Sequence, residues 1–226
     1  MSRSDSEGIL RNWIVQLAGV ALFSVGAVQC TTGVDPSPDP GIVRVMIKGV
    51  ESDTMIVIQS DTSEFSRWDV FDLYLSTGRV YRGDIYSTIY NNPSDDRKGS
   101  DTVNILAREW LDGSPITPRD TARITPQNSK WINYVIFESY VPPGNYDRLY
   151  FSLTATEMEI FIPKHYLNPV QLPPGVEPGM GFDIPFTVTE GGVTEIYLEI
   201  YPYQSLSRYK DAFYFDRQMV VTNVTW

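Results

Sequence analysis

The feature that most limits how this 226-residue chain folds is a one-by-one alternation of hydrophobic and polar residues in Tyr146–Ile162. Successive side chains of a strand point to opposite faces, so this pattern predicts a long strand with one buried face. The parity of the alternation changes near Thr156–Glu157, which predicts a β-bulge or turn there. The expected inward residues are Leu149, Phe151, Leu153 and Ala155 before the change, and Met158, Ile160 and Ile162 after it.

Strand-like segments fill most of the chain after residue 41. In Val193–Tyr201, the residues Ile196, Leu198 and Ile200 share one face, which predicts a half-buried antiparallel strand. Further strands are expected at Ile42–Gly49, Thr54–Gln59, Trp68–Leu75, Tyr86–Tyr90, Thr102–Leu106 and Lys130–Tyr140.

Turn signals separate these segments, whereas helical signals are scarce. Gly and Pro mark turns at Pro142–Asn145, Pro173–Gly175, Pro178–Gly181 and Glu190–Gly192. One short helix or turn is expected in Thr102–Leu111, and long loops are expected at Tyr90–Asp101 and Lys164–Gly181. Many short strands without intervening helices predict an all-β fold, an antiparallel two-sheet sandwich.

An apolar segment precedes this domain. Trp13–Val28 contains only Gln16 and Ser24 as polar members, and as a helix its sixteen residues would span about 24 Å. That length is short of the roughly 30 Å hydrocarbon core of a bilayer. The segment is therefore typical of the apolar region of an export signal, with a retained membrane-anchoring helix as the alternative.

The only cysteine, Cys30, ends the apolar segment, and a Pro-rich tract follows at Asp35–Pro40. A lone cysteine at this junction is typical of a bacterial lipoprotein leader, in which the sulfur is acylated and the cysteine becomes the new N-terminus. Cleavage elsewhere is the remaining alternative. The expected organisation is a signal or anchor at residues 1–30, a tether at 31–41 and a β-sandwich domain at 42–226.

The charge of the chain excludes one class of partner. The net charge is −10, and no basic run is present to attract a phosphate backbone. Nucleic-acid binding is therefore not expected. A single cysteine also allows no internal disulfide, so burial of a core must stabilise the domain.

The residues that favour catalysis are few. The only histidine, His165, would need Ser139 or Ser152 beside it to form a nucleophile–base pair. Glu157 and Glu159 lie two residues apart on one strand face, but solvated surface carboxylates explain them as well. We therefore expect a protein that is not an enzyme.

Metal and cofactor sites are not expected either. Zinc sites of the usual Cys/His type lack ligands. Ser94–Asp101 offers oxygen ligands, but it does not have the spacing of a calcium loop. No glycine-rich phosphate loop leads into a helix, so no nucleotide cofactor is predicted.

Aromatic residues leave a ligand-binding function open. Tyr and Trp side chains can stack on sugars, although most aromatic residues of a β-protein pack in its core. The candidate contacts for a ligand or partner are Trp68, Trp110, Trp131 and Trp226. A ligand-binding protein of this kind needs an exposed row of Trp or Tyr on one face.

The C-terminal half carries motifs of a known kind. Val141–Tyr146 forms a V-P-x-G-x-Y turn before a strand, Phe186–Ile200 places a glycine turn before a long strand, and Gln204–Leu206 precedes Phe213–Val224. This pattern resembles an uncharacterised family of bacterial and archaeal lipoprotein domains of unknown function. The resemblance implies a sandwich of transthyretin-like or immunoglobulin-like shape on an envelope lipoprotein, and it implies no catalytic residue.

These observations favour an exported, membrane-anchored protein of the bacterial cell envelope, with its domain in the periplasm or on the cell surface. The expected attachment is lipid on Cys30 or the helix 13–28, and a protein partner in the envelope is predicted. The main hypothesis is a non-catalytic scaffold, adhesion or accessory-subunit module. The alternative is a lipoprotein that binds a glycan or small ligand through exposed aromatic residues.

Overall fold

The computed structural model describes residues 37–58, 61–64, 70–91, 102–116, 127–162, 164–210 and 212–226, with the backbone alone at 56–58, 61–64, 102, 155–162 and 164–168. The chain divides after Pro38, and residues 39–226 form one compact unit. The predictions for the segment 13–28, for Cys30 and for Trp68 lie outside the described residues, as does the possible calcium loop at 94–101.

The described residues form strands and turns and contain no helix, so the prediction of an all-β fold is confirmed. That part of the chain accordingly holds no helical segment with the length and apolar character needed to span a bilayer. The strands are β1 (Gly41–Gly49), β2 (Met55–Ile58), β3 (Asp61–Glu64), β4 (Val70–Leu75), β5 (Gly78–Arg82), β6 (Ile85–Ile89), β7 (Thr102–Asn104), β8 (Arg108–Trp110), β9 (Ser129–Trp131), β10 (Tyr134–Val141), β11 (Gly144–Ile162), β12 (Lys164–Gln171), β13 (Gly179–Val188), β14 (Val193–Ile200), β15 (Leu206–Tyr209), β16 (Ala212–Phe215) and β17 (Met219–Thr225).

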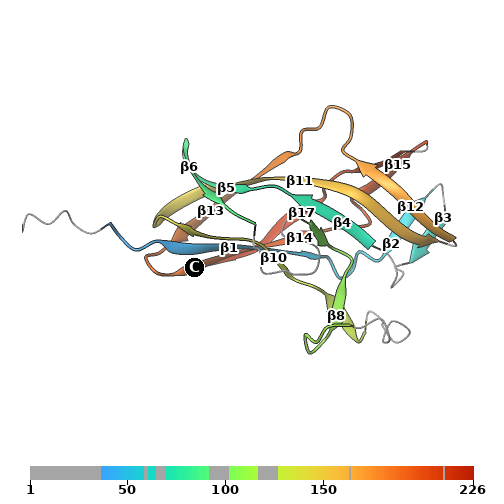
Figure 1. Ribbon diagram of the computed structural model, residues 1–226, viewed down its shortest axis with the longest axis horizontal. Coiled ribbons are helices and arrows are strands. Elements are labelled where there is room, and N and C mark those ends of the chain that lie inside the picture. The colour runs from blue at the N-terminus through green and yellow to red at the C-terminus, as the bar shows by residue number, and fades with distance from the viewer. Residues whose placement is uncertain are drawn as a thin grey trace, which may run out of the picture. The chain divides into compact units, whose positions relative to one another are not determined.

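Two larger sheets make up most of the fold (Figure 1). The smaller one has four strands in the order β10-β1-β14-β17. The larger one has nine strands and is built around β11. Two further pairs, β2–β3 and β8–β9, form separate two-stranded ribbons.

The long strand β11 joins the two halves of the larger sheet. Its first half pairs with β13 on one side and β5 on the other, and β6 extends the sheet beyond β5. Its second half pairs with β12 and β4. The register against β4 shifts between Ala155 and Glu157, which confirms the irregularity predicted from the change of parity.

The hydrophobic core lies between the two sheets. Leu149, Phe151 and Leu153 of β11 are fully buried, as the alternation predicted. The facing sheet contributes alternate residues of β1 and β14, namely Val43, Val45, Ile47, Ile196, Leu198 and Ile200, all of which are buried. Two sheets that bury their inner faces against one another give an arrangement consistent with a β-sandwich.

The predicted strand directions were partly wrong. Val193–Ile200 (β14) pairs antiparallel with β17 but parallel with β1, and β12 pairs parallel with β16. The sheets are therefore mixed. Alternation of side chains has the same period in parallel and antiparallel strands, so the pattern alone does not specify direction.

Two predicted connections also differ in the structure. Lys164–Gln171 forms β12 and Gly179–Val188 forms β13, so the long loop predicted for 164–181 shrinks to the Pro173–Gly175 turn and its neighbours. Both strands are specified by pairing with β11, a tertiary contact that outweighs their proline and glycine content. In Thr102–Leu111, β7 and β8 flank a turn, so the helical alternative was wrong.

The V-P-x-G-x-Y motif has a structural function. It makes the tight turn between β10 and β11, and the Tyr146 hydroxyl donates a hydrogen bond of 2.8 Å to the Pro142 carbonyl. The Tyr146 ring stacks on Phe186 of β13 at 5.4 Å between centroids. The motif therefore fixes where β11 starts and how it meets β13.

Candidate functional site

The predicted tryptophan contacts do not gather into a site. Trp131 of β9 is only 1% exposed and belongs to the core. Trp110 of β8 is half-buried on the same ribbon. Trp226, after β17, is 64% exposed. The described tryptophans therefore form no exposed row.

The histidine and serines predicted as a possible catalytic pair are not brought together in the way that chemistry requires. His165 pairs with Phe161 of β11, whereas Ser152 lies nine residues earlier on the same strand, opposite Gly179. At about 3.3 Å per residue that separation is roughly 30 Å. Ser139 lies on β10 in the other sheet, where its hydroxyl accepts a hydrogen bond of 2.8 Å from the Tyr90 amide.

The described residues also show no metal site, and the two carboxylates considered from the sequence lie along one strand. Glu157 and Glu159 lie on β11, with their backbone opposite Asp72 and Val70 of β4. Among the described residues, no three side chains of His, Cys, Asp or Glu come close enough to hold a metal ion.

A different group of side chains stands out on the outer surface of β6, β5 and β11. Two registered rows cross these strands, one through Tyr150, Arg79 and Thr88 and one through Arg148, Tyr81 and Tyr86. The residues between them in sequence, Val80 and Leu149, are buried in the core. Because strand side chains alternate, the rows point away from the core. We call the set Arg79, Tyr81, Tyr86, Arg148 and Tyr150 the Tyr–Arg face.

Contacts within the Tyr–Arg face fix its side chains. The Arg148 guanidinium lies 4.2 Å from the centroid of the Tyr81 ring, and that of Arg79 lies 4.7 Å from the centroid of Tyr86. Tyr81 also contacts Tyr86 and Tyr150, with ring centroids 5.6 and 6.5 Å apart. Cation–π and aromatic contacts of this kind reduce the freedom of long side chains before any ligand binds.

The arginines of this face have no carboxylate partner among the described residues, although the protein carries a large excess of acid. A hydrogen bond to Tyr81 raises the pKa of Arg79 above its ordinary value, so its guanidinium stays charged. The Arg148 Nε is buried without a hydrogen-bond partner among those residues. Neither guanidinium is therefore neutralised by a described carboxylate.

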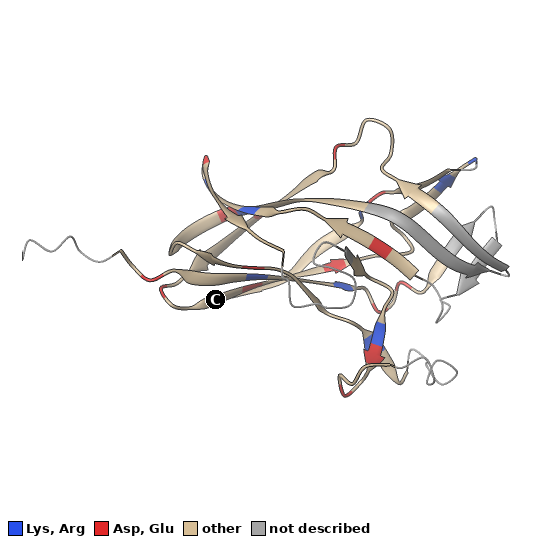
Figure 2. Ribbon diagram, in the orientation of Figure 1, with Lys and Arg blue, Asp and Glu red and all other residues tan. Residues whose placement is uncertain are grey.

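The outer surface of the four-stranded sheet shows the opposite arrangement. Arg44 of β1 pairs with Glu138 at 2.6 Å and Glu195 at 2.8 Å, its neighbours in register on β10 and β14. Lys48 pairs with Glu199 at 3.1 Å. Basic and acidic segments are interspersed over the described strands (Figure 2). The two cations of this sheet surface, Arg44 and Lys48, are thus neutralised by neighbouring carboxylates, in contrast to the Tyr–Arg face.

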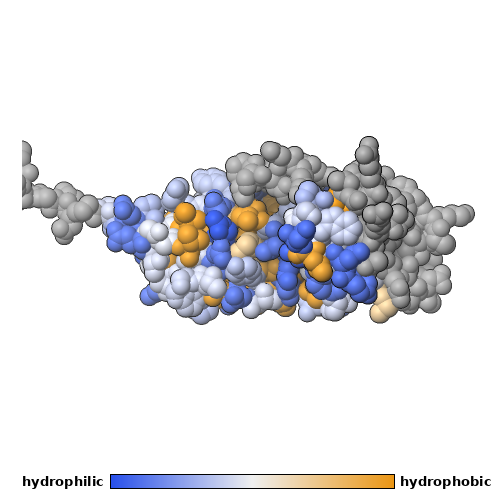
Figure 3. All heavy atoms as spheres, turned by 90° about the horizontal axis from the view of Figure 1, so that it is seen from below, coloured by the Kyte–Doolittle hydropathy of each residue, from blue (hydrophilic) through white to orange (hydrophobic). Residues whose placement is uncertain are grey.

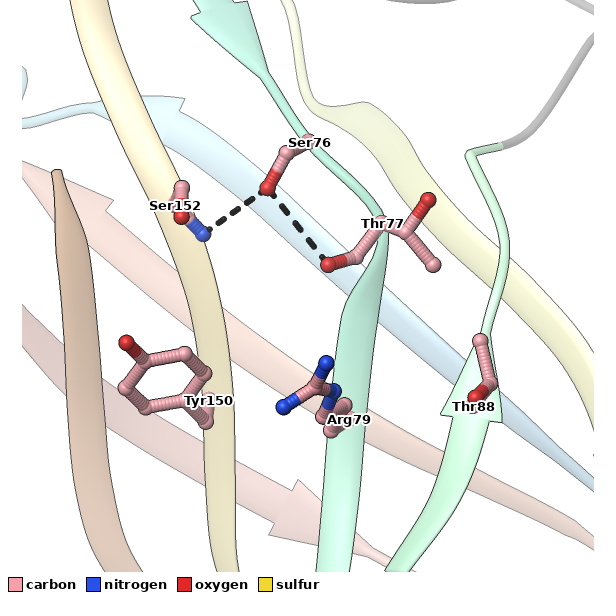
Figure 4. Close-up of a pocket in the computed structure, with 6 residues that line it drawn as sticks. All are labelled: Ser76, Thr77, Arg79, Thr88, Tyr150 and Ser152. Carbon is pink, nitrogen blue, oxygen red and sulfur yellow. Dashed lines mark hydrogen bonds between the residues drawn. The ribbon is translucent and has the colours of Figure 1, made fainter.

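A surface hollow of about 430 Å³ opens beside Arg79, lined by Ser76, Thr77, Arg79, Thr88, Tyr150 and Ser152. Tyr150, Arg79 and Thr88 stand side by side on neighbouring strands, and the hydroxyl-bearing residues Ser152, Ser76 and Thr77 lie at one end (Figure 4). The Ser76 hydroxyl accepts a hydrogen bond of 3.2 Å from the Ser152 amide. Every lining residue is polar, so the hollow fits a hydroxyl-rich ligand better than an apolar one.

Gly179 of β13 leaves room for Tyr150, which lines the hollow. A Cβ atom built on Gly179 would lie 1.8 Å from the Tyr150 hydroxyl oxygen and 2.6 Å from the ring carbon that carries it. Only glycine therefore allows the Tyr150 ring to lie over the backbone of β13. A side chain at this position would force the ring to move.

Figure 3 shows the molecule from below, coloured by hydropathy. Hydrophobic residues there form small patches separated by hydrophilic ones. Such scattered apolar residues are normal for a solvated protein surface.

A buried carboxylate stabilises the turn after β14. Asp53 is 2% exposed, and its Oδ2 accepts hydrogen bonds from the amides of Tyr203 at 2.8 Å and Gln204 at 3.2 Å. Burial raises the pKa of Asp53 above its ordinary value of 3.8, although the hydrogen bonds oppose this shift. The folded state therefore binds this proton more tightly than the unfolded chain does, and the free energy of unfolding falls as pH rises through the folded pKa.

We predict that Asp53→Asn raises the free energy of unfolding at pH 7, or leaves it unchanged, because its amide oxygen replaces Oδ2 without a buried charge. Asp53→Ala should lower it by about 1–3 kcal/mol, because two amides lose their acceptor. Urea unfolding of both variants between pH 4 and pH 8 measures these effects. Equal destabilisation by the two substitutions would contradict the prediction.

Sequence reasoning missed the Tyr–Arg face because it concentrated on tryptophans. The signal was present in the polar positions of the alternating strand, where Arg148, Tyr150 and Ser152 follow one another at a spacing of two. The matching set on Gly78–Arg82 was not recognised, since that segment was not predicted as a strand. Only the pairing of β5 with β11 on one edge and with β6 on the other brings the two sets together.

Comparison with known proteins gives this chain no family. No protein-family model matches it, no curated protein is significantly similar to it, and no solved structure matches it. The resemblance of residues 141–224 to the lipoprotein family therefore stays a prediction. The function has to be argued from the geometry of the chain itself.

Proposed function

We propose that this protein is a non-catalytic binding module of the bacterial cell envelope, anchored to a membrane through Cys30 and docked onto its target through the Tyr–Arg face. The observation that carries the binding function is the pair of guanidinium groups without carboxylate partners among the described residues, set among three tyrosines on paired strands. For the domain, we retain the proposal of a transthyretin-like or immunoglobulin-like sandwich.

The composition of the face supports binding. Tyr and Arg are enriched in recognition surfaces, because each offers a large contact area together with a polar group. Their side chains are already positioned by cation–π contacts, so little conformational entropy remains to be lost on binding. A face built in this way, on rigid strands, favours recognition of a partner at the membrane surface.

The sequence around Cys30 supports the anchor. The apolar segment 13–28 ends two residues before it, and the Pro-rich tract Asp35–Pro40 separates it from β1. Proline-rich chain extends by roughly 3.1 Å per residue, so such a tether holds a domain clear of the lipid headgroups.

We predict that the full protein, extracted from bacterial membranes, lacks residues 1–29 and carries a diacylglyceryl group on Cys30. Intact mass spectrometry measures both changes at once. Cys30→Ser should block lipid addition and leave the leader in place. An unmodified full-length mass for the native chain would overturn the lipid anchor and indicate a retained helix.

We predict that a photo-reactive residue in place of Tyr86 forms cross-links to an envelope component in intact cells, because Tyr86 is 50% exposed within the face. The matched control is the same residue in place of Val220, which is 42% exposed on β17 of the other sheet. Adducts from position 86 that are missing from position 220 would support the proposal. Equal adducts from both positions, or none from position 86, would overturn it.

A further inference from the structure

We propose that the hollow beside Arg79 binds a carboxylated sugar, one acidic unit within an otherwise uncharged glycan. This inference rests on the proposed binding function and names the chemical class of its ligand. It assigns the contacts to Arg79, Tyr150 and the hydroxyl groups around them, in place of the tryptophans that the sequence suggested.

Arg79 supplies the positive charge that binds the carboxylate of the sugar. Its guanidinium lines the hollow and has no carboxylate partner among the described residues. A planar guanidinium binds a carboxylate through two parallel hydrogen bonds, which gives both strength and orientation. The second guanidinium, Arg148, stacks on Tyr81 and stabilises the aromatic part of the face.

The rest of the hollow matches the hydroxyl groups of a sugar. Ser76, Thr77, Thr88 and Ser152 line it, and a hydroxyl group can both donate and accept a hydrogen bond. The Tyr150 ring offers an apolar surface to the C–H groups of a sugar and a hydroxyl at its tip. At about 430 Å³, the hollow lies at the lower end of ordinary ligand pockets, enough for roughly one or two sugar rings.

The charge of the whole protein limits how acidic this ligand is. A net charge of −10 repels a polymer with closely spaced anions. Asp183 of β13 also lies opposite Arg148 in register, so acid borders the face. A glycan with isolated carboxylates gains the contact to Arg79 and avoids most of this repulsion. A free inorganic anion would leave the Tyr150 ring unused.

The test uses the full protein in mild detergent and three hexasaccharide probes. One contains a single uronic acid among neutral sugars, the second is the same chain with its carboxylate reduced to an alcohol, and the third is densely sulfated. Isothermal titration calorimetry measures binding. We expect the first probe to bind, the second to bind about 10–100-fold more weakly because a charge-assisted pair is lost, and the third to bind more weakly than the first.

Substitutions of single arginines test which side chain binds the carboxylate of the sugar. Arg79→Ala should weaken binding of the first probe by about 10–100-fold, and Arg79→Lys should restore little because an ammonium cannot bind both carboxylate oxygens. The matched control is Arg44→Ala. Arg44 and its two carboxylate partners belong to the four-stranded sheet, away from the hollow, so this variant should bind the probe unchanged. Far-ultraviolet circular dichroism and the melting temperature confirm that each variant is folded.

The possible results separate this inference from the proposed function. Equal binding of the first and second probes, or unchanged binding by Arg79→Ala, would overturn the carboxylated sugar. Cross-linking at position 86 without binding of any probe would overturn it as well and leave the binding module standing. Failure of both experiments would remove the proposed function together with its ligand.

Discussion

Replacement of Phe151 by alanine is expected to lower the free energy of unfolding by about 3–5 kcal/mol, the range for removing a buried aromatic ring from a core. Phe151 is fully buried on β11, and its ring centroid lies 5.4 Å from that of Phe137 on β10. The Phe182 ring of β13 also stacks on Phe151, with 5.8 Å between the ring centroids. Since β10 and β11 belong to different sheets, the ring connects the two layers directly.

Chemical unfolding of the full protein in mild detergent measures this effect. Val220→Ala, at a 42% exposed position, is the matched control and should change stability by less than about 0.5 kcal/mol. A double-mutant cycle with Phe137→Leu and Phe151→Leu should give a coupling of about 0.5–1.5 kcal/mol. A cost below about 1 kcal/mol for Phe151→Ala would mean that the layers are not packed as described.

Trp131→Ala is also expected to lower the free energy of unfolding by about 3–5 kcal/mol. The molecules of this variant that stay folded should bind the ligand as the native protein does. Trp131 is 1% exposed, and the Arg108 guanidinium lies 4.3 Å from its ring centroid. Its backbone amide donates a hydrogen bond of 2.9 Å to Glu51. Removal of the indole therefore leaves a cavity beside a buried cation.

The three described tryptophans offer a direct comparison. Trp226→Ala should change stability by less than about 0.5 kcal/mol, because that side chain is 64% exposed. Thermal unfolding and calorimetric titration of the same samples separate stability from binding. Loss of binding in Trp131→Ala at a temperature where the variant is folded would contradict its assignment to the core and restore it as a ligand contact.

The strands with one buried face were the most predictable part of the fold. In Tyr146–Ile162 the alternation specified the inward residues Leu149, Phe151 and Leu153, and the change of parity located the irregularity near Glu157. These features depend on the local geometry of an extended chain, so the order of residues contains them.

Strands that rely on their neighbours were not predictable in this way. Residues 164–181 read as a loop, yet they contribute β12 and the start of β13, because both segments pair with successive parts of β11. The parallel pairing of β1 with β14 was likewise missed, since strand direction depends on the route of the connecting chain.

The sequence by itself determined that the described part of the chain is all-β. It also determined which residues of β11 and β14 face the core. For the tryptophans, it offered candidate contacts without showing which of them are buried. The tertiary structure decided which tryptophan is buried and which residues form a surface. Arg79 and Tyr81 are about seventy positions from Arg148 and Tyr150 in the chain, yet β5 and β11 are neighbours in the sheet. A binding face assembled across strands depends on their pairing register, and that register is set by burial of the whole core.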